Sequence, residues 1–289
     1  MAILNHSRRT LLKMLGLGAA ALTFPDFKLF GGDGKKARIA LQLYTVRTLF
    51  ETDFDGTMQA IADVGFAGIE TYPLPAGVPV EHAAKVFKNL GLEVVGMHMD
   101  LPSGKQRDTA LRMADVYACE KVIYPGWPEG YRDADGVSRV VDVFNETAAF
   151  LDSKGLRFGL HNHTWEFELI GGVYPYYYLL QHLDNIIFFE IDTYWAKCAG
   201  LDPARIVGDF GSRAPLLHIK DGPARKGEES SPQVPAGEGS MNFPAIAEAG
   251  KGNTQWMIVE FDTYEKNLID GIRKSYAFLT QRGLAEGKI

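Results

Sequence analysis

Residues 186–221 read IIFFEIDTYWAKCAGLDPARIVGDFGSRAPLLHIKD and contain a complete strand, helix and strand unit. The apolar run Ile186–Ile191 predicts a buried strand that the polar Asp192 ends. The pair Asp202-Pro203 marks a helix start, because aspartate caps free backbone N–H groups and proline fits the first helical turn. A second apolar run, Leu216–Ile219, follows. This order predicts two neighbouring parallel strands joined by a helix.

The same unit recurs along the chain from residue 37 onward. The starts of the apolar runs lie roughly 25–40 residues apart, as in a barrel of about 250 residues. The pattern predicts a single α/β domain, a (β/α)8 TIM barrel over residues 37–289. The eight predicted strands are Arg38–Tyr44, Ala67–Tyr72, Leu92–Met99, Lys121–Tyr124, Leu156–His161, Ile186–Ile191, Leu216–Ile219 and Trp256–Phe261.

Glycines mark where the predicted helices end. Gly65, Gly91 and Gly155 each stand between a helical pattern and a strand, and glycine accepts the left-handed conformation that terminates a helix. A doubly wound open sheet, the alternative, would carry a glycine-rich phosphate loop after its first strand. The residues found there, Thr45-Val46-Arg47, contain no glycine, so the barrel is favoured.

The first 30 residues have the pattern of a targeting segment. SRRTLLK at residues 7–13 precedes a small-residue apolar run over residues 14–22, and together they resemble a twin-arginine export signal. The run is about half of the ~20 residues that a membrane span needs, so no stable span is expected after export. We therefore predict a signal segment over residues 1–30 and a periplasmic or cell-envelope location.

Composition and charge exclude several classes of protein. Hydrophobic residues at 46% and charged residues at 23% are typical of a globular domain. The net charge of −6 offers no basic surface for nucleic acid. Cys119 and Cys198 form no CxxC pair and are expected to be buried or unpaired thiols. A homo-oligomer is compatible with these features.

Polar residues end the predicted strands, where barrel enzymes place their reactive groups. A lone histidine at such a position is usually a hydrogen-bonded structural residue, but ligand types here end several apolar runs, and unpaired buried charges are costly. A hard cation prefers carboxylates, and imidazole shifts the preference toward Zn²⁺ or Co²⁺. We therefore predict one divalent ion, Mn²⁺, Mg²⁺, Co²⁺ or Zn²⁺, bound by His161, Asp192, His218 and Glu260.

Several short motifs resemble the xylose-isomerase-like barrel superfamily, whose members include sugar phosphate isomerases and epimerases. The resemblance implies a divalent metal held by a carboxylate after strand five, Asp after six, His after seven and Glu after eight. His161 departs from this pattern, because sugar epimerases carry Glu there. The motifs are QLYTVR (42–47), GIE (68–70), HNH (161–163), ID (191–192), HIKD (218–221), GEG (237–239) and VE (259–260).

The departure at His161 bears on the reaction. The resemblance implies that ketose epimerases use two glutamates on opposite faces of the substrate, and only Glu260 remains here. The histidine-rich fifth strand is similar to the branch of inosose dehydratases and 3-keto-glycoside lyases or hydratases. This favours proton abstraction next to a carbonyl followed by elimination or hydration. Glu260 is the candidate base, and Lys220, His163 and Glu70 are candidates for the acid.

The expected substrate is a sugar or cyclitol. The aromatic residues near the strand ends could stack on a sugar ring, although core packing is the alternative for each one. The long segment Pro223–Ser240, rich in glycine, proline and charge, is expected to fold over the substrate. The candidate substrate-binding residues are Tyr44, His98, Trp127, Trp165, Glu166 and Tyr194.

Three other functions remain as alternatives. A sugar isomerase or epimerase would use the same residues without loss of water or aglycone. A non-catalytic sugar-binding barrel would keep the fold without turnover. Endonuclease IV, which shares this barrel, needs a basic groove, and the net charge of −6 opposes it.

Overall fold

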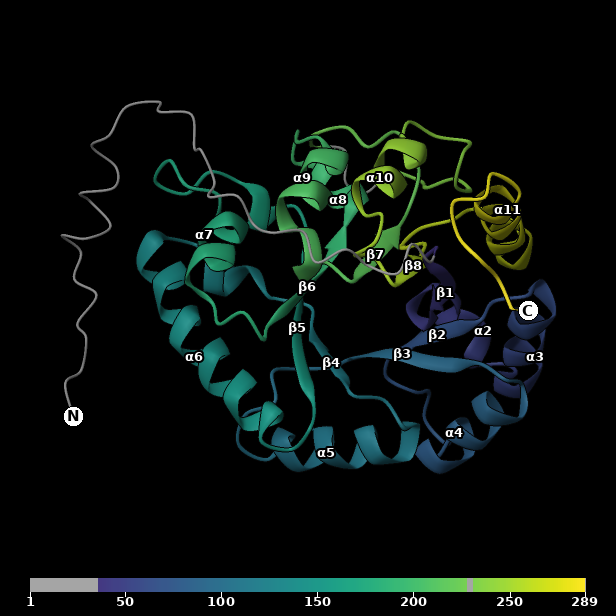
Figure 1. The fold of residues 1–289 in the computed structure, drawn as a ribbon. Helices are drawn as coiled ribbons and strands as arrows, with labels where there is room; N and C mark the ends of the chain where they lie inside the picture. Colours follow the sequence, from purple (N-terminus) through teal and green to yellow (C-terminus); the bar gives the residue numbers. More distant parts are fainter. Residues whose placement is uncertain (1–35, 228–230, 289) are drawn as a thin grey trace.

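A computed structural model describes residues 36–227 and 231–288, so the predicted export signal over residues 1–30 lies outside it. Eight strands form a closed barrel in which each strand is parallel to both neighbours, in sequence order (Figure 1). Each of the eight predicted runs overlaps one strand, which confirms the fold class. The strands are β1 (Arg38–Gln42), β2 (Gly68–Thr71), β3 (Glu93–His98), β4 (Lys121–Tyr124), β5 (Arg157–His161), β6 (Phe188–Asp192), β7 (Leu216–Ile219) and β8 (Trp256–Val259).

Helices lie outside the strands, with α4, α5 and α6 along one side of the barrel in Figure 1. Short 3-10 turns occur in the connections: η1 (Leu43–Val46), η2 (Pro128–Tyr131), η3 (Trp165–Phe167) and η4 (Gly211–Arg213). The helices are α2 (Arg47–Phe50), α3 (Phe54–Val64), α4 (Val80–Asn89), α5 (Gln106–Tyr117), α6 (Ala134–Asp152), α7 (Pro175–His182), α8 (Thr193–Cys198), α9 (Pro203–Phe210), α10 (Phe243–Ala249) and α11 (Leu268–Gln281).

Two strands end earlier than the apolar pattern predicts, because side chains take over the backbone hydrogen bonds. The Gln42 side chain accepts a bond of 3.0 Å from the Tyr44 amide, and the chain turns into η1 there. At the end of β8 the Phe261 amide donates to Thr45 Oγ1 at 3.1 Å instead of to a neighbouring strand. Both deviations lie at the carboxyl end of the barrel.

The predicted helix signals are present. Gly65, Gly91 and Gly155 all have positive φ angles, of 109°, 63° and 74°, which a residue with a Cβ rarely adopts. Asp202 accepts a hydrogen bond of 3.1 Å from the Ala204 amide at the start of α9. The glycine and aspartate signals in the sequence therefore mark actual ends and starts of helices.

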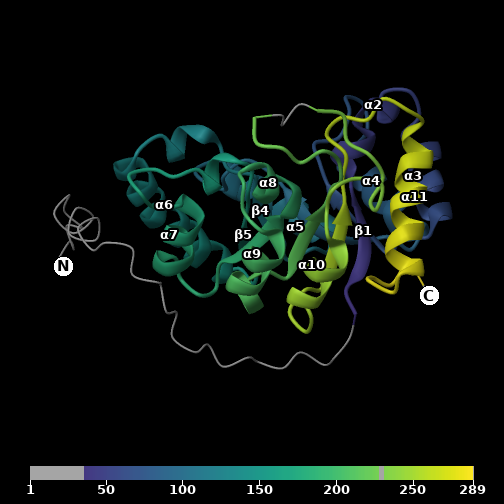
Figure 2. The ribbon, with the colours of Figure 1, turned by 90° about the horizontal axis from the view of Figure 1, so that it is seen from above.

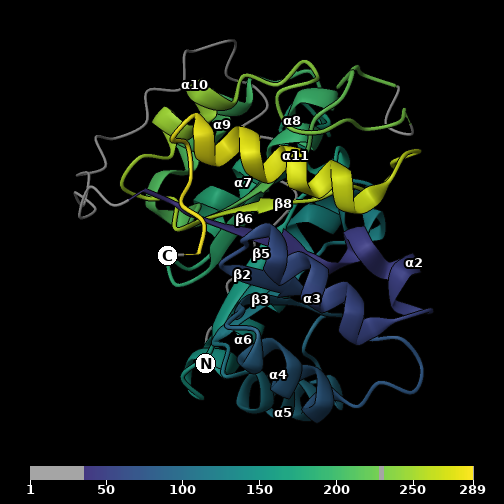
Figure 3. The ribbon, with the colours of Figure 1, turned by 90° about the vertical axis from the view of Figure 1, so that its right-hand side faces the viewer.

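The end of the described chain returns to its beginning. The Glu286 amide donates to the Ala37 carbonyl at 2.8 Å, and the Ile39 amide donates to the Glu286 carbonyl at 2.9 Å. The last helix, α11, lies beside α3 in two perpendicular views (Figures 2 and 3). These contacts close the ring of helices around the first strand.

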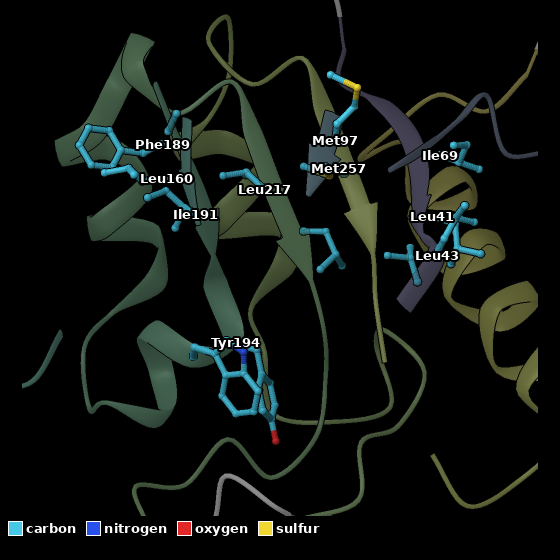
Figure 4. Close-up of a cluster of buried hydrophobic side chains, with 14 of the residues drawn as sticks. Leu41, Leu43, Ile69, Met97, Leu160, Phe189, Ile191, Tyr194, Leu217 and Met257 are labelled. Carbon is cyan, nitrogen blue, oxygen red and sulfur yellow. The ribbon is translucent and has the colours of Figure 1, made fainter. Parts of the chain in front are cut away.

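The outer faces of the strands form the main hydrophobic core against the helices. Successive strand residues point to opposite faces, so alternate apolar residues leave the barrel and pack under the helices. Figure 4 shows such residues from several strands together with Tyr194. Fully buried members include Leu41, Ile69, Met97, Phe189, Ile191 and Leu217.

The inner faces change character along the barrel axis. On β6 the residues that share the inner face run from Phe188 through Glu190 to Asp192, so they go from apolar to charged. A separate buried cluster of apolar residues fills the lower part of the barrel, which we name the apolar floor. Charged side chains are therefore confined to the upper part. The floor consists of Ala40, Ala67, Val95, Ile123, Phe188, Leu216, Trp256 and Ile258.

Two further predictions concern thiols and membranes. Cys119 and Cys198 are both buried thiols outside any disulfide, as expected from their spacing. Among the described residues, no helix has the length and apolar character needed to cross a membrane.

Candidate functional site

Three of the predicted ligands converge at the carboxyl end of the barrel, and we name Asp192, His218 and Glu260 the mouth site. Their ligand atoms all lie within 4.8 Å of one another. His218 Nδ1 is 2.6 Å from Glu260 Oε2 and 3.8 Å from Asp192 Oδ2. All three side chains are buried, because they end strands β6, β7 and β8 on the inner face.

The mouth site passes a test for a bound cation. Asp192 Oδ2, His218 Nδ1 and Glu260 Oε2 are buried atoms without a hydrogen bond of regular geometry, and their polar contacts are ion pairs with Lys220 and between His218 and Glu260. Buried polar atoms almost always form hydrogen bonds, so three ligand atoms that lack them and face one another fit a bound cation. Two carboxylate oxygens and one imidazole nitrogen are donors suited to Mn²⁺, Co²⁺ or Zn²⁺.

Lys220 lies against the mouth site. Its Nζ is 2.9 Å from Asp192 Oδ2, 2.8 Å from Glu260 Oε2 and 2.7 Å from Asp262 Oδ2. Burial opposes the charge of this ammonium, but the three carboxylates outweigh burial and raise the Lys220 pKa well above its ordinary value. The Glu260 pKa is held well below its usual value against burial, first by the Lys220 ammonium and, in the metal-free site, also by a protonated His218. Lys220 and Glu260 therefore form a protonated and a deprotonated group in contact.

Beneath the mouth site lies a second group of polar side chains, which we name the inner cluster: Glu70, His98, His161, Glu190 and the Nε2 edge of His218. Both glutamates are fully buried. His98 Nε2 lies 2.6 Å and His161 Nδ1 lies 3.1 Å from Glu190 Oε2. His218 Nε2 lies 2.7 Å from Glu70 Oε2.

The tautomer of His218 follows from the inner cluster. If Nε2 carries the proton that Glu70 accepts, Nδ1 presents its lone pair to the mouth site. Carboxylates commonly orient metal-binding histidines in this way. Glu70 also accepts a bond of 2.7 Å from Gln42 Nε2. Gly96 leaves room for this carboxylate, since a Cβ at residue 96 would lie 2.6 Å from Glu70 Oε1.

His161 is grouped differently from the other predicted ligands. Its ligand atom lies close to those of His98, Glu190 and His218. It does not belong to the group of ligand atoms that forms the mouth site. The departure from a carboxylate at the end of β5 therefore coincides with an additional carboxylate, Glu190, one layer deeper on β6. Metal binding by His161 remains a prediction.

Glu190 was missed by sequence reasoning, which considered only the residues that end each strand. A signal was available: Glu190 stands two residues before Asp192, so it must share its face of β6. A charged residue within an otherwise apolar strand demands partners, and His98 and His161 supply them.

The loop after β5 carries three more predicted site residues. His163 stacks on Trp165, with ring centroids 4.1 Å apart, and burial lowers the His163 pKa to about 3. Glu166 is fully buried and accepts a hydrogen bond of 2.8 Å from the His163 amide. Burial raises the Glu166 pKa to about 8. Glu166 thus holds the loop, and its position gives no support to a substrate contact.

The remaining predicted substrate contacts differ in exposure. Trp127 is 51% exposed, and the partly buried Tyr44 ring lies under the Arg47 guanidinium at 3.7 Å. His98 lies at the top of the inner cluster with its side chain 12% exposed. Tyr194 is fully buried in the main core, where its hydroxyl accepts a bond of 3.3 Å from the Ala224 amide. The structure therefore leaves Tyr44, His98 and Trp127 accessible and encloses Tyr194.

Asp221 organises the long loop after β7. Its Oδ1 accepts from the amides of Gly222 and Met241 at 2.8 and 3.1 Å. Its Oδ2 accepts from the amides of Gly237 and Gly239 at 2.9 and 3.0 Å. The GEG motif at residues 237–239 thus brings two amides to one buried carboxylate.

The same loop reaches the lysine of the mouth site. Gln233 Nε2 donates to Asp262 Oδ2 at 2.9 Å, and the Asp262 amide donates to Gln233 Oε1 at 2.8 Å. Asp262 in turn contacts Lys220. The loop is therefore linked to Lys220 through Gln233 and Asp262.

Solved structures share this architecture. A sugar phosphate isomerase/epimerase from Parabacteroides distasonis aligns with a TM-score of 0.76 at 21% identity, covering 91% of this chain and all of its own. A probable 3-DHS dehydratase from Bacillus anthracis aligns at 0.67 and 15% identity, covering 85% and 100%. A 3-keto-D-glucoside 4-epimerase from E. coli aligns at 0.64 and 17% identity, covering 85% and 100%. At these identities the likeness shows the fold alone.

The sequence itself gives the family. A search of curated proteins found no match. The family model of the xylose isomerase-like TIM barrel matches residues 58–282, which include strands β2 to β8 and every residue of the mouth site. This chain belongs to the xylose isomerase-like TIM barrel family.

Proposed function

We propose that the chain is an enzyme that removes a proton next to a carbonyl of a sugar or cyclitol and eliminates water or an alcohol from the adjacent carbon, or adds it. The observation that carries the proposal is the contact of Glu260 with Lys220 at the point where the ligand atoms of Asp192, His218 and Glu260 converge. A divalent cation bound by Asp192, His218 and Glu260 would polarise the carbonyl oxygen and so make the neighbouring C–H bond acidic.

The residues present assign the two proton-transfer roles. Glu260 is the base, since its carboxylate is deprotonated and lies at the open end of the barrel. Among the three predicted acids, burial keeps His163 uncharged, and Glu70 is committed to His218 and Gln42. Lys220 is the remaining candidate, because it carries a proton and contacts Glu260.

The proposed elimination balances in protons and electrons. Glu260 takes the proton from the carbon next to the carbonyl, and the electron pair of that C–H bond forms a new C=C bond. The C–O bond on the following carbon breaks, and the departing oxygen takes a proton from Lys220. The reverse sequence is a hydration. Epimerisation is the alternative and requires only that the proton return to the same carbon from the other face.

The test is proton NMR in D2O of the protein loaded with diamagnetic Zn²⁺ or Mg²⁺. The substrates are 3-keto-glucosides, inososes and free ketoses. Loss of aglycone or water supports the proposal, whereas deuterium incorporation with an epimer or an aldose-ketose product supports the isomerase alternative. Absence of both reactions favours the non-catalytic barrel. Glu260→Gln is expected to lose activity at least 100-fold, and His82→Gln, at an exposed pair with Asp55, is the matched control.

We also propose that residues 1–30 direct export to the periplasm or cell envelope by the twin-arginine route. The support is the RRTLLK sequence and the small-residue run that follows it. Replacing Arg8 and Arg9 together by lysine is expected to retain the protein in the cytoplasmic fraction. Unchanged distribution between cell fractions would contradict this.

A further inference from the structure

The inner cluster holds ligand-type atoms that the mouth site does not use. His98, His161 and Glu190 come from β3, β5 and β6, and their ligand atoms meet at one point inside the barrel. Nothing in the proposed reaction requires three such groups below the base and the acid. Their convergence therefore needs an explanation of its own.

We propose that the chain binds a second divalent cation, with His98 Nε2, His161 Nδ1 and Glu190 Oε2 as its ligands. Two imidazoles and one carboxylate are a recognised ligand set for Fe²⁺, and imidazole also suits Zn²⁺ and related ions. The nitrogens lie 2.6 and 3.1 Å from the shared carboxylate oxygen. Tetrahedral ligand atoms at about 2.0–2.2 Å from one ion lie roughly 3.3–3.6 Å apart, so the histidine nitrogens would move away from Glu190 Oε2 by up to about 1 Å to admit the ion.

Orphaned oxygens in the inner cluster favour this reading. Glu190 Oε1 and Glu70 Oε1 are buried atoms with no hydrogen-bond partner, although both residues are fully buried. A cation can use the second oxygen of Glu190, and it lowers the cost of burying Glu70 nearby. The cluster thus has spare acceptor capacity beside its ligand atoms.

The net charge of the whole polar region also favours a second cation. Glu70, Glu190, Asp192, Glu260 and Asp262 contribute five carboxylates, and the ammonium at their centre is Lys220. With neutral imidazoles, four negative charges remain uncompensated. One divalent ion at the mouth site neutralises half of them, and a second in the inner cluster neutralises the rest.

His218 separates the two cations without binding both. Its Nε2 edge faces Glu70, at 2.7 Å, and its Nδ1 edge faces the mouth site. Because the Nε2 proton stays on the ring, no doubly deprotonated imidazole is needed. The inner ion also gives His161 a role, since a histidine at the end of β5 reaches Glu190 and completes the inner ligand set.

The competing explanation is that protonated histidines, instead of a second cation, balance the charge of the buried carboxylates. If His98 and His218 are imidazolium ions, they balance Glu70 and Glu190 by ion pairs alone. The two explanations differ in metal stoichiometry, which can be measured without any substrate. The experiment therefore counts cations per chain.

The full chain, stripped of metal, is titrated with Co²⁺ at pH 7.5, followed by visible absorption, and bound metal is counted by mass spectrometry after dialysis. Two equivalents per chain are expected for the wild type, and one for Glu190→Gln and for His98→Gln. Asp192→Asn is expected to keep one equivalent with the spectrum of the inner ion. A single equivalent in the wild type, or two equivalents retained in both inner-cluster variants, would overturn the proposal.

Two controls keep the result interpretable. Circular dichroism verifies that each variant is folded, and His98→Gln serves if Glu190→Gln unfolds, because the His98 side chain is partly exposed. His82→Gln, at an exposed histidine, is expected to retain both equivalents. The outcome is independent of the proposed function: two bound ions without turnover would refute only the reaction, and turnover with one ion would refute only the second site.

Discussion

At the scale of single residues, Lys220 affects how tightly the mouth site binds a cation. Its ammonium lies within 2.9 Å of an oxygen of two predicted ligands, so it competes with a metal ion for the same negative charge. Asp262 offers this ammonium a third carboxylate that is not a predicted ligand. The lysine can therefore remain paired while the ligands bind an ion.

Replacing Lys220 by methionine is expected to tighten metal binding and to reduce turnover. Two unit charges 4 Å apart interact by about 4 kcal/mol at the effective dielectric of a protein, so removing the ammonium should raise the affinity for Zn²⁺ about tenfold or more. Isothermal titration calorimetry measures the affinity. Unchanged or weaker binding would show that Lys220 does not compete with the ion.

A second prediction concerns Glu166 and pH. Burial raises the Glu166 pKa to about 8 from the ordinary 4.5, so the folded protein keeps a proton that the unfolded chain has lost. Folding stability therefore falls as pH rises between these values, by up to about 1.4 kcal/mol per pH unit. Glu166→Gln keeps the shape and cannot ionise, so its Tm should fall less between pH 5 and pH 8. A variant with the same pH dependence as the wild type would contradict this.

At the scale of elements, the loop over residues 222–241 depends on one carboxylate. Asp221 accepts four backbone N–H groups, two of them from the GEG motif. The described residues of the loop form no helix or strand, so this side chain and the Gln233–Asp262 pair hold them in place. The loop that is predicted to fold over the substrate is thus fixed by Asp221 and by the Gln233–Asp262 pair.

Asp221→Ala is expected to destabilise the protein by about 3 kcal/mol or more, because the substitution leaves several amides without an acceptor. The loop should also become the first site of limited proteolysis. Asp202→Ala, which removes an exposed helix cap, serves as the comparison and should cost about 1 kcal/mol. Equal losses for both variants would mean that Asp221 acts only as a local cap.

The elements were predictable from the sequence because apolar runs and glycine signals are local. The ends of β1 and β8 were not, since Gln42 and Thr45 replace ladder bonds with side-chain bonds that the apolar pattern does not contain. Convergence of Asp192, His218 and Glu260 could be inferred from their places at strand ends. The pairing of His161 with Glu190 could not, because it depends on the depth of each side chain in the barrel.

At the scale of the whole molecule, a bound cation should couple to global stability, since the mouth site joins strands from one side of a closed barrel. An ion at about 100 times its Kd stabilises the folded state by about 2.7 kcal/mol. For a chain of this size that corresponds to a rise in Tm of about 5–10 °C. Differential scanning fluorimetry with Zn²⁺ and with EDTA measures the shift. Asp192→Asn should reduce the shift, and an equal shift in that variant would place the ion elsewhere.

The apolar floor has a consequence for the order of events in the barrel. Because Phe188, Trp256 and their neighbours close the lower part, a solute can reach Glu190 only from the carboxyl end of the barrel, and it must leave by the same route. An ion held by His98 and Glu190 would therefore exchange through the end of the barrel at which the substrate binds. A chelator should then remove this ion more slowly while substrate or product is bound.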